Sequence, residues 1–278
     1  MPGWELLGIL VAGVGIGCLG AMLGIGGGSL MVPFLTLAMG VPIHNAIAAS
    51  IVAVIATSSA AAAIYLGNRI TNLRLGVTLE VTTTIGGILG GLTAVSLDRT
   101  TLTLVFALSL VGVAVAMARQ TEVVLEVVSV PEAREEGDLG GCYHDPNLRR
   151  DVRYRVRWLP LGLGFSALAG LLSGLLGIGG GIVKVPTMVL GMRVPVKAAV
   201  ATSNFMIGVT AAASAYIYYS AGLVDPPVTS AVAVGVFLGS LAGARWAPHI
   251  HRDILSRGFA LMLIVVAALM VLSVLGVY

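Results

Sequence analysis

The hexapeptide Leu-Gly-Ile-Gly-Gly-Gly at residues 23–28 recurs without change at residues 176–181, which lie 153 positions further along the chain. The match continues without a gap, and 15 of the 28 positions from Leu23 to Ser50 are identical at this offset. An internal repeat of this kind governs the whole architecture. Because the repeated unit is a glycine cluster in very apolar sequence, it predicts a membrane transporter that is built from two related halves.

The composition also predicts a membrane protein. Apolar residues make up 57% of the 278 residues and charged residues only 10%, with a mean hydropathy of +0.99. A soluble domain typically has about 25% charged residues, so a chain this poor in charge could not cover a water-facing surface. The formal net charge is only +3, and no basic cluster is interleaved with aromatic residues, which argues against a nucleic-acid partner.

Ten apolar segments can be placed along the chain. Most of them approach the roughly 20 residues that a helix needs to cross the hydrocarbon core. The second and the seventh segments are too short for this, and each directly follows a glycine cluster. We therefore expect an all-α integral membrane protein with about ten segments. These segments cover residues 4–23, 28–41, 43–66, 75–97, 101–118, 158–177, 181–192, 196–220, 228–247 and 254–277.

Two of the longer segments carry small residues of their own, among them Gly86, Gly90, Gly239 and Gly243. Small residues in membrane helices usually allow two helices to approach closely. We interpret these four positions as helix-packing sites.

The basic residues predict how the two halves are oriented. If each short segment enters and leaves on one side of the membrane, fourteen of the sixteen Lys and Arg residues share one face, Lys184 lies within a segment, and only Arg99 falls opposite. Basic residues mark the cytoplasmic face, so we expect both termini outside and the central loop in the cytoplasm. Equivalent loops then lie on opposite faces. This predicts two inverted repeats, residues 1–118 and 158–278, each with a glycine-broken helical hairpin and three spanning helices.

Residues 119–157 form the only sizeable polar stretch, which we interpret as a cytoplasmic linker between the halves. Apolar and charged residues alternate over residues 122–128 and again over residues 153–157, which indicates a small β-hairpin. Cys142, His144 and Asp145 are residue types that bind metals. One Cys and one His without a second pair are a weak signal for a metal site, so no metal is expected here.

The glycine clusters are the first candidate for a binding site. Three consecutive glycines should break a membrane helix, and the broken end leaves several N–H groups without intrahelical partners. Irregular backbone at membrane depth must face protein or a water-filled cavity, and a helix N-terminus that points into such a cavity favours an anion. Close helix packing is the alternative role of the motif. The expected substrate contacts in the two clusters are Gly26, Gly27, Gly28, Ser29, Gly179, Gly180 and Gly181.

Polar side chains at membrane depth extend this candidate site. Ser50 and Ser203 are repeat equivalents, as are Thr57 and Thr210, so each pair could line one cavity from two sides. Asn204 has no polar counterpart in the first half and could donate two hydrogen bonds to an oxyanion. The alternative for the hydroxyls is a hydrogen bond back to their own helix.

Three ionisable residues complete the candidates. Lys184 is expected too deep in the membrane to reach the surface, and it could attract an anion. Glu80 could carry a proton, although its place near a helix end favours an interfacial carboxylate beside Arg69 and Arg74. His44 could titrate near neutral pH, but it falls at the expected outer boundary, where a surface role is favoured.

The paired motif resembles the sulfite exporter TauE/SafE family. The resemblance rests on the two Leu-Gly-Ile-Gly-Gly-Gly copies, each followed by Val-Pro and by Ala-x-Ala-x-Ser, and it covers residues 10–97 and 163–250. It implies a bacterial inner-membrane permease without cofactors, which exports small sulfur-containing anions such as sulfite, sulfoacetate or other organosulfonates with proton coupling. A passive anion channel and an uptake permease for another small anion remain alternatives. An enzyme is not expected, because the membrane segments lack a cluster of His, Cys or carboxylate residues. The oligomeric state stays open.

Overall fold

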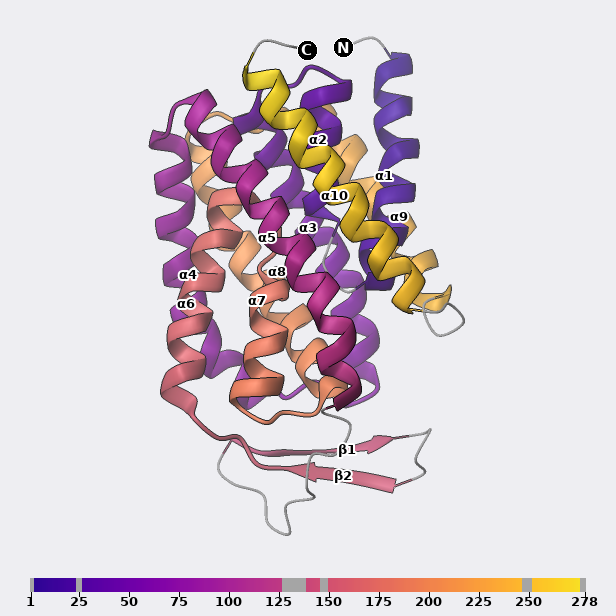
Figure 1. Cartoon of the computed structure of the whole chain (residues 1–278), viewed down its shortest axis with the longest axis vertical. Helices are drawn as coiled ribbons and strands as arrows, with labels where there is room; N and C mark the ends of the chain where they lie inside the picture. The colour runs from indigo at the N-terminus through magenta and orange to yellow at the C-terminus, as the bar shows by residue number, and fades with distance from the viewer. Residues whose placement is uncertain (1–2, 24–26, 127–138, 146–149, 247–251, 276–278) are drawn as a thin grey trace.

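A computed structural model describes residues 3–23, 27–126, 139–145, 150–246 and 252–275 of the chain. Within these residues the fold consists of ten α-helices, two short π-helical segments and one β-hairpin (Figure 1). The elements are α1 (Gly3–Leu23), α2 (Gly28–Pro33), η1 (Phe34–Ala38), α3 (Ile43–Gly67), α4 (Leu73–Ser96), α5 (Arg99–Glu126), β1 (Gly141–Asp145), β2 (Arg150–Tyr154), α6 (Leu159–Leu176), α7 (Gly181–Pro186), η2 (Thr187–Gly191), α8 (Val196–Ser220), α9 (Pro226–Trp246) and α10 (Arg252–Val274).

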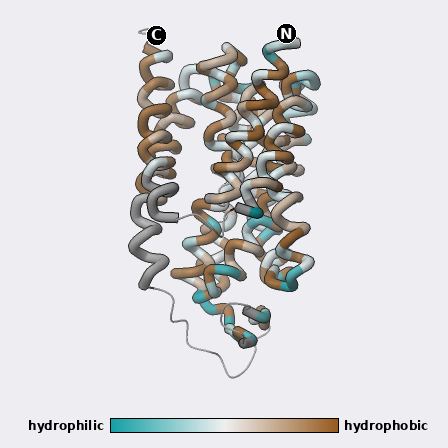
Figure 2. Tube along the Cα trace, turned by 90° about the vertical axis from the view of Figure 1, so that its right-hand side faces the viewer, coloured by the Kyte–Doolittle hydropathy of each residue, from teal (hydrophilic) through white to brown (hydrophobic). Residues whose placement is uncertain are grey.

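Seven of the described helices are long and apolar enough to cross a membrane, which confirms the all-α membrane fold. Their outer faces are apolar as well. On α4, for example, every residue of one stripe is more than half exposed although all are large and apolar: Val77, Val81, Ile85, Leu89 and Leu92. Such an apolar stripe suits contact with lipid. Hydrophilic residues gather around the hairpin end of the molecule (Figure 2).

The helices of the two halves interleave. Helix α3 packs on α8 at the centre, α1 packs on α9, and α4 packs on α6. Further contacts join α3 to α9, α4 to α8 and α5 to α10. If each helix is exchanged for its counterpart in the other half, every one of these pairs maps onto itself or onto another pair of the set.

Glycines allow the closest of these helix contacts, as the sequence predicted. A Cβ atom added at Gly86 or Gly90 on α4 would collide with backbone carbonyls of α6, and one added at Gly239 or Gly243 on α9 would collide with carbonyls of α1. These helices therefore touch backbone to backbone, which is the usual function of small residues in membrane helices.

The two short segments also match the prediction. Helices α2 and α7 start at Gly28 and Gly181, and each passes through a proline into a π-helical segment. With η1 and η2 they form apolar stretches that end at Ala38 and Gly191. Figure 1 shows α2 in the half of the bundle near the two chain ends and α7 in the half near the β-hairpin. The chain ends are thus at one end of the bundle and the hairpin is at the other.

The β-hairpin differs from the prediction in its first strand. Strand β2 includes Arg153 and Tyr154 and pairs in antiparallel register with β1, where Cys142 opposes Arg153. Residues 122–126, which were expected in a strand, instead continue α5. The alternation of apolar and charged residues there is short, and a helix that is already several turns long extends at little cost because only its first turn is unfavourable to form.

Candidate functional site

The two glycine breaks meet inside the bundle. The Ser50 hydroxyl on α3 donates to the carbonyl oxygen of Gly177, which follows α6, at 2.9 Å, and lies 3.3 Å from the carbonyl oxygen of Gly28, the first residue of α2. A Cβ atom at Gly28 would collide with the Gly177 carbonyl oxygen. The backbones of the two breaks are therefore in contact, and a buried serine joins them.

One pair of equivalent glycines, Gly27 and Gly180, differs in backbone conformation between the two copies. Gly177, Gly179 and Gly180 have φ angles of +69°, +85° and +68°, a region that favours glycine. Gly27, the equivalent of Gly180, has a φ of −54°, which any residue can adopt. Gly26 lies outside the described residues. In the second copy the motif thus needs glycine for its backbone angles, and at Gly28 it needs glycine for close approach.

Ser203 differs from its repeat equivalent in its hydrogen bonding. Its side chain is only 1% exposed, and its hydroxyl has no hydrogen-bond partner among the described residues. Its neighbour Asn204 donates from Nδ2 to the carbonyl oxygen of Val200 at 2.9 Å, so this amide bonds back to its own helix. Ser29 is buried one residue into α2. The Ser203 hydroxyl is therefore free to bind something else, whereas the Asn204 amide already donates to its own helix.

Three elements bring a buried ion pair together. Lys184 on α7 is 1% exposed and donates from Nζ to the hydroxyl of Thr210 on α8 at 3.2 Å. That hydroxyl donates to Oε1 of Glu80 on α4 at 2.5 Å, and Thr84 also donates to this oxygen at 3.1 Å. The other carboxylate oxygen, Oε2, lies 3.9 Å from Nζ of Lys184 and has no hydrogen-bond partner among the described residues.

The favoured interpretation of Glu80 as an interfacial carboxylate is therefore wrong. Glu80 is only 6% exposed and faces α7 and α8. Position in the sequence gave its distance from the helix end but not the direction in which its side chain points. His44, by contrast, lies at the start of α3, where Nε2 is 3.1 Å from the carbonyl oxygen of Leu97 at the end of α4. The structure therefore separates His44 from the buried ion pair.

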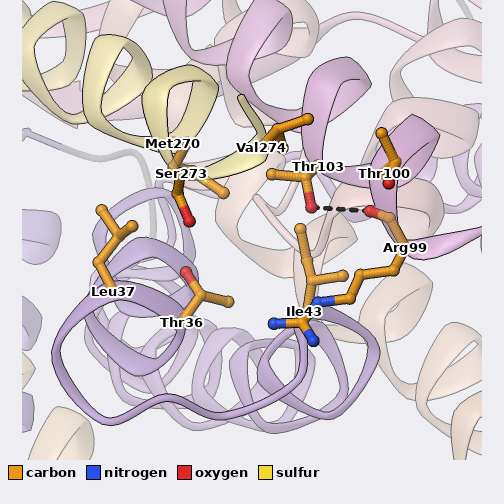
Figure 3. Close-up of a pocket in the computed structure, with 9 residues that line it drawn as sticks. All are labelled: Thr36, Leu37, Ile43, Arg99, Thr100, Thr103, Met270, Ser273 and Val274. Atoms are coloured by element: carbon orange, nitrogen blue, oxygen red, sulfur yellow. Dashed lines mark hydrogen bonds between the residues drawn. The ribbon is translucent and has the colours of Figure 1, made fainter. Parts of the chain in front are cut away.

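A pocket opens at the end of the bundle where the chain ends lie. It has a volume of about 200 Å³ and is enclosed by η1 and by the adjacent ends of α3, α5 and α10. Figure 3 shows the side chain of Arg99 and the hydroxyls of Thr36 and Ser273 around it. The sequence places Arg99 on the face opposite the other basic residues that lie outside the segments. The pocket therefore has a positive charge at the end of the bundle where the chain ends lie.

Comparison with known proteins bears on this arrangement. Residues 9–270 match the family described as Sulfite exporter TauE/SafE. The chain belongs to that family. It is 24% identical to the "Probable membrane transporter protein YunE" of Bacillus subtilis over 85% of this chain and 86% of that protein. It is 28% identical to a "Probable membrane transporter protein" of Xylella fastidiosa over 88% and 87% of the two chains. No solved structure matches the chain.

Membership of the TauE/SafE family and the apolar helices identify the chain as a multi-pass membrane transporter. Its sequence had drawn attention to Lys184, Glu80 and Thr210 separately, and only the fold joins them. Thr84, which also binds Glu80, was not expected to contribute, although its spacing of four residues on one helix is the signal that could have revealed it. In the sequence, Arg99 was used only to predict which loops share a side of the membrane, and its place in the pocket was not expected.

Proposed function

We propose that this TauE/SafE protein is a secondary transporter that exports small sulfur-containing anions, such as sulfite, sulfoacetate or other organosulfonates. Transport would occur by alternating access with protons as the coupling ion, in the bacterial inner membrane. The observation that carries this proposal is the contact between the two glycine breaks at Ser50. Broken helices that meet inside a bundle are the arrangement in which many transporters bind their substrate.

The proposal includes an inverted relation between the halves. The helix pairs are symmetric under exchange of the halves, which supports two related halves. The position of α2 and α7 toward opposite ends of the bundle supports their inversion (Figure 1). In transporters with this symmetry, one group of helices rocks against the other around a fixed central site. The pocket at Arg99 suits an opening through which an anion leaves on the outer side.

The binding site can be tested with two equivalent serines. Purified protein should be stabilised against heat by sulfite, thiosulfate or sulfoacetate but not by simple carboxylates. A ligand at one hundred times its Kd stabilises by about 2.7 kcal/mol. Ser203→Ala should keep the melting temperature of the ligand-free protein, since its hydroxyl has no partner among the described residues, while it weakens the stabilisation by anions.

Ser50→Ala is the matched control, because it removes the hydroxyl that joins Gly28 and Gly177 and should lower the melting temperature even without ligand. If no sulfur-containing anion stabilises the wild-type protein, the proposed substrate class is wrong. Flux of such an anion from proteoliposomes then tests transport itself, and a flux that ignores a pH gradient would favour a passive channel.

A further inference from the structure

Glu80 and Lys184 are both buried, yet their charged groups do not form a direct hydrogen bond. Their closest approach of 3.9 Å exceeds hydrogen-bond distance, and Oε2 of Glu80 has no donor among the described residues. Lys184 has three N–H donors, and its one hydrogen bond to a described residue goes to Thr210. Both charged groups therefore keep free positions that face each other.

Among the side chains that the structure describes, no other charge substitutes for either partner. The elements around the pair are α4, α6, α7, η2 and α8, with α5 against α7. Among the described side chains of these elements, the remaining charges belong to Arg74, Lys197 and Arg99, which stand at helix ends. Arg119, Glu122 and Glu126 of α5 lie outside the described side chains. Helix α8 also carries the buried tyrosine Tyr218, but its hydroxyl donates to the carbonyl oxygen of Gly174 and not to the pair. Within the described side chains, Glu80 and Lys184 thus balance only each other.

The internal repeat shows that the fold itself does not require this pair. The offset of 153 residues still aligns Gly86 with Gly239 beyond the glycine motif, and at the same offset Lys184 corresponds to Met31 and Glu80 to Ala233. Each half thus contributes one member of the pair, and the site related to it by the repeat has apolar residues at both positions. The two charges therefore occur at only one of two equivalent sites, as expected for a pair with a joint task.

An oxyanion that binds Lys184 changes the charge balance of this site. The anion occupies the free N–H groups of the ammonium, and two negative groups then share one positive charge. Like charges in a buried site disfavour ionisation of the weaker acid, and here that group is the Glu80 carboxylate. Its unpartnered Oε2 can accept a proton, which leaves the site with one cation and one bound anion.

We propose that Glu80 and Lys184 form an exchange pair in which a small oxyanion replaces the Glu80 carboxylate on Lys184 while Glu80 takes up one proton. This inference rests on the proposed transport function and adds its coupling step. No covalent bond changes, since one proton and one anion enter and leave together. A monovalent anion and one proton then move together without net charge, so the combined gradients of anion and proton set the direction of net transport.

The pair predicts the pH dependence of binding. If one proton binds with each anion, the Kd falls about tenfold for each unit by which the pH is lowered, as long as Glu80 is ionised in the anion-free protein. We expect this slope for sulfoacetate between about pH 6 and about pH 8, where its acid groups stay ionised. The measurement is calorimetric titration of the full-length protein in nanodiscs.

Variants separate the roles of the two residues. Glu80→Gln, which mimics protonated Glu80, should bind sulfoacetate with no slope and more tightly than the wild type does at the lowest pH of the range. Lys184→Met should weaken binding at least tenfold. The double variant Glu80→Ala and Lys184→Met copies Ala233 and Met31 of the equivalent site, so it should fold and bind no sulfoacetate. His144→Gln, an exposed residue of the hairpin, should keep the wild-type slope.

Each other outcome has a defined meaning. A slope that persists in Glu80→Gln, or that disappears in His44→Gln, overturns the exchange pair and leaves the transport function intact. Wild-type affinity in Lys184→Met, or a flat profile in a wild-type protein that binds the anion, overturns it equally. If the wild-type protein binds neither sulfoacetate nor sulfite nor thiosulfate, both the proposed function and the exchange pair are wrong.

Discussion

At the scale of single residues, identical sequences in the two halves have acquired different constraints. Gly27 and Gly180 occupy equivalent positions in the same hexapeptide, yet only Gly180 has a left-handed backbone. Their surroundings differ as well. A Cβ atom at Gly180 would lie 2.7 Å from the carbonyl oxygen of Ala169, whereas one at Gly27 would make ordinary contacts of 3.4 Å with Ile16 and Val236.

Alanine substitutions should therefore separate these two glycines. Gly180→Ala should largely abolish sulfoacetate flux in proteoliposomes, because a left-handed backbone costs alanine about 1–2 kcal/mol and the carbonyl must also move. Gly27→Ala should retain most of the flux, and only a bulkier residue there should impair it. Melting temperatures show whether each variant remains folded. Wild-type flux in a folded Gly180→Ala protein would contradict a role for this break in transport.

At the scale of elements, the closest helix contacts depend on glycines that face a neighbouring backbone. On α6, Gly170 and Gly174 face carbonyl groups of Thr83 and Gly87 on α4, while Gly164 on the same helix faces open space. Without water to drive apolar surfaces together, packing and close approach hold such helices in the bilayer. The α4–α6 contact also positions Glu80, because Glu80 lies on α4 just before Thr83.

Two glycines of α6 test this contact. Gly174→Ala should lower the free energy of unfolding by about 1–3 kcal/mol, the usual cost of overpacking a close contact. Gly164→Ala should leave it unchanged or raise it slightly, because alanine favours a helix by up to about 1 kcal/mol over glycine. Thermal or denaturant unfolding in detergent measures both. Equal stabilities of the two variants would argue that α4 and α6 are farther apart than described.

At the scale of the whole molecule, the charge distribution and the fold agree on which segments share an end. The β-hairpin lies at one end of the bundle, and both chain ends lie at the other (Figure 1). The turn between α4 and α5, where Arg99 lies, is at the end of the chain termini. By the distribution of basic residues, the hairpin end should face the cytoplasm.

Labelling of cysteines tests this orientation. Cys142 is exposed on the hairpin, and Ser96 is exposed at the end of α4. A membrane-impermeant maleimide added to intact cells should label Ser96→Cys in a Cys142→Ser background but should not label Cys142. In inverted vesicles the pattern should reverse. The opposite result would place the hairpin outside, and equal labelling of both sites in sealed cells would contradict their location at opposite ends.

The sequence by itself determined the class of protein, the two related halves, the two shortened segments and the glycines between packed helices. These features depend on hydropathy, on residue identity at a fixed offset and on residue size, all of which are properties of the chain in one dimension. Only the tertiary structure decided that the breaks meet at Ser50, that Glu80 points inward to Lys184, and that Gly27 and Gly180 differ. Such contacts depend on how each helix is rotated about its axis against helices distant in sequence, and a uniformly apolar helix carries little signal for that rotation.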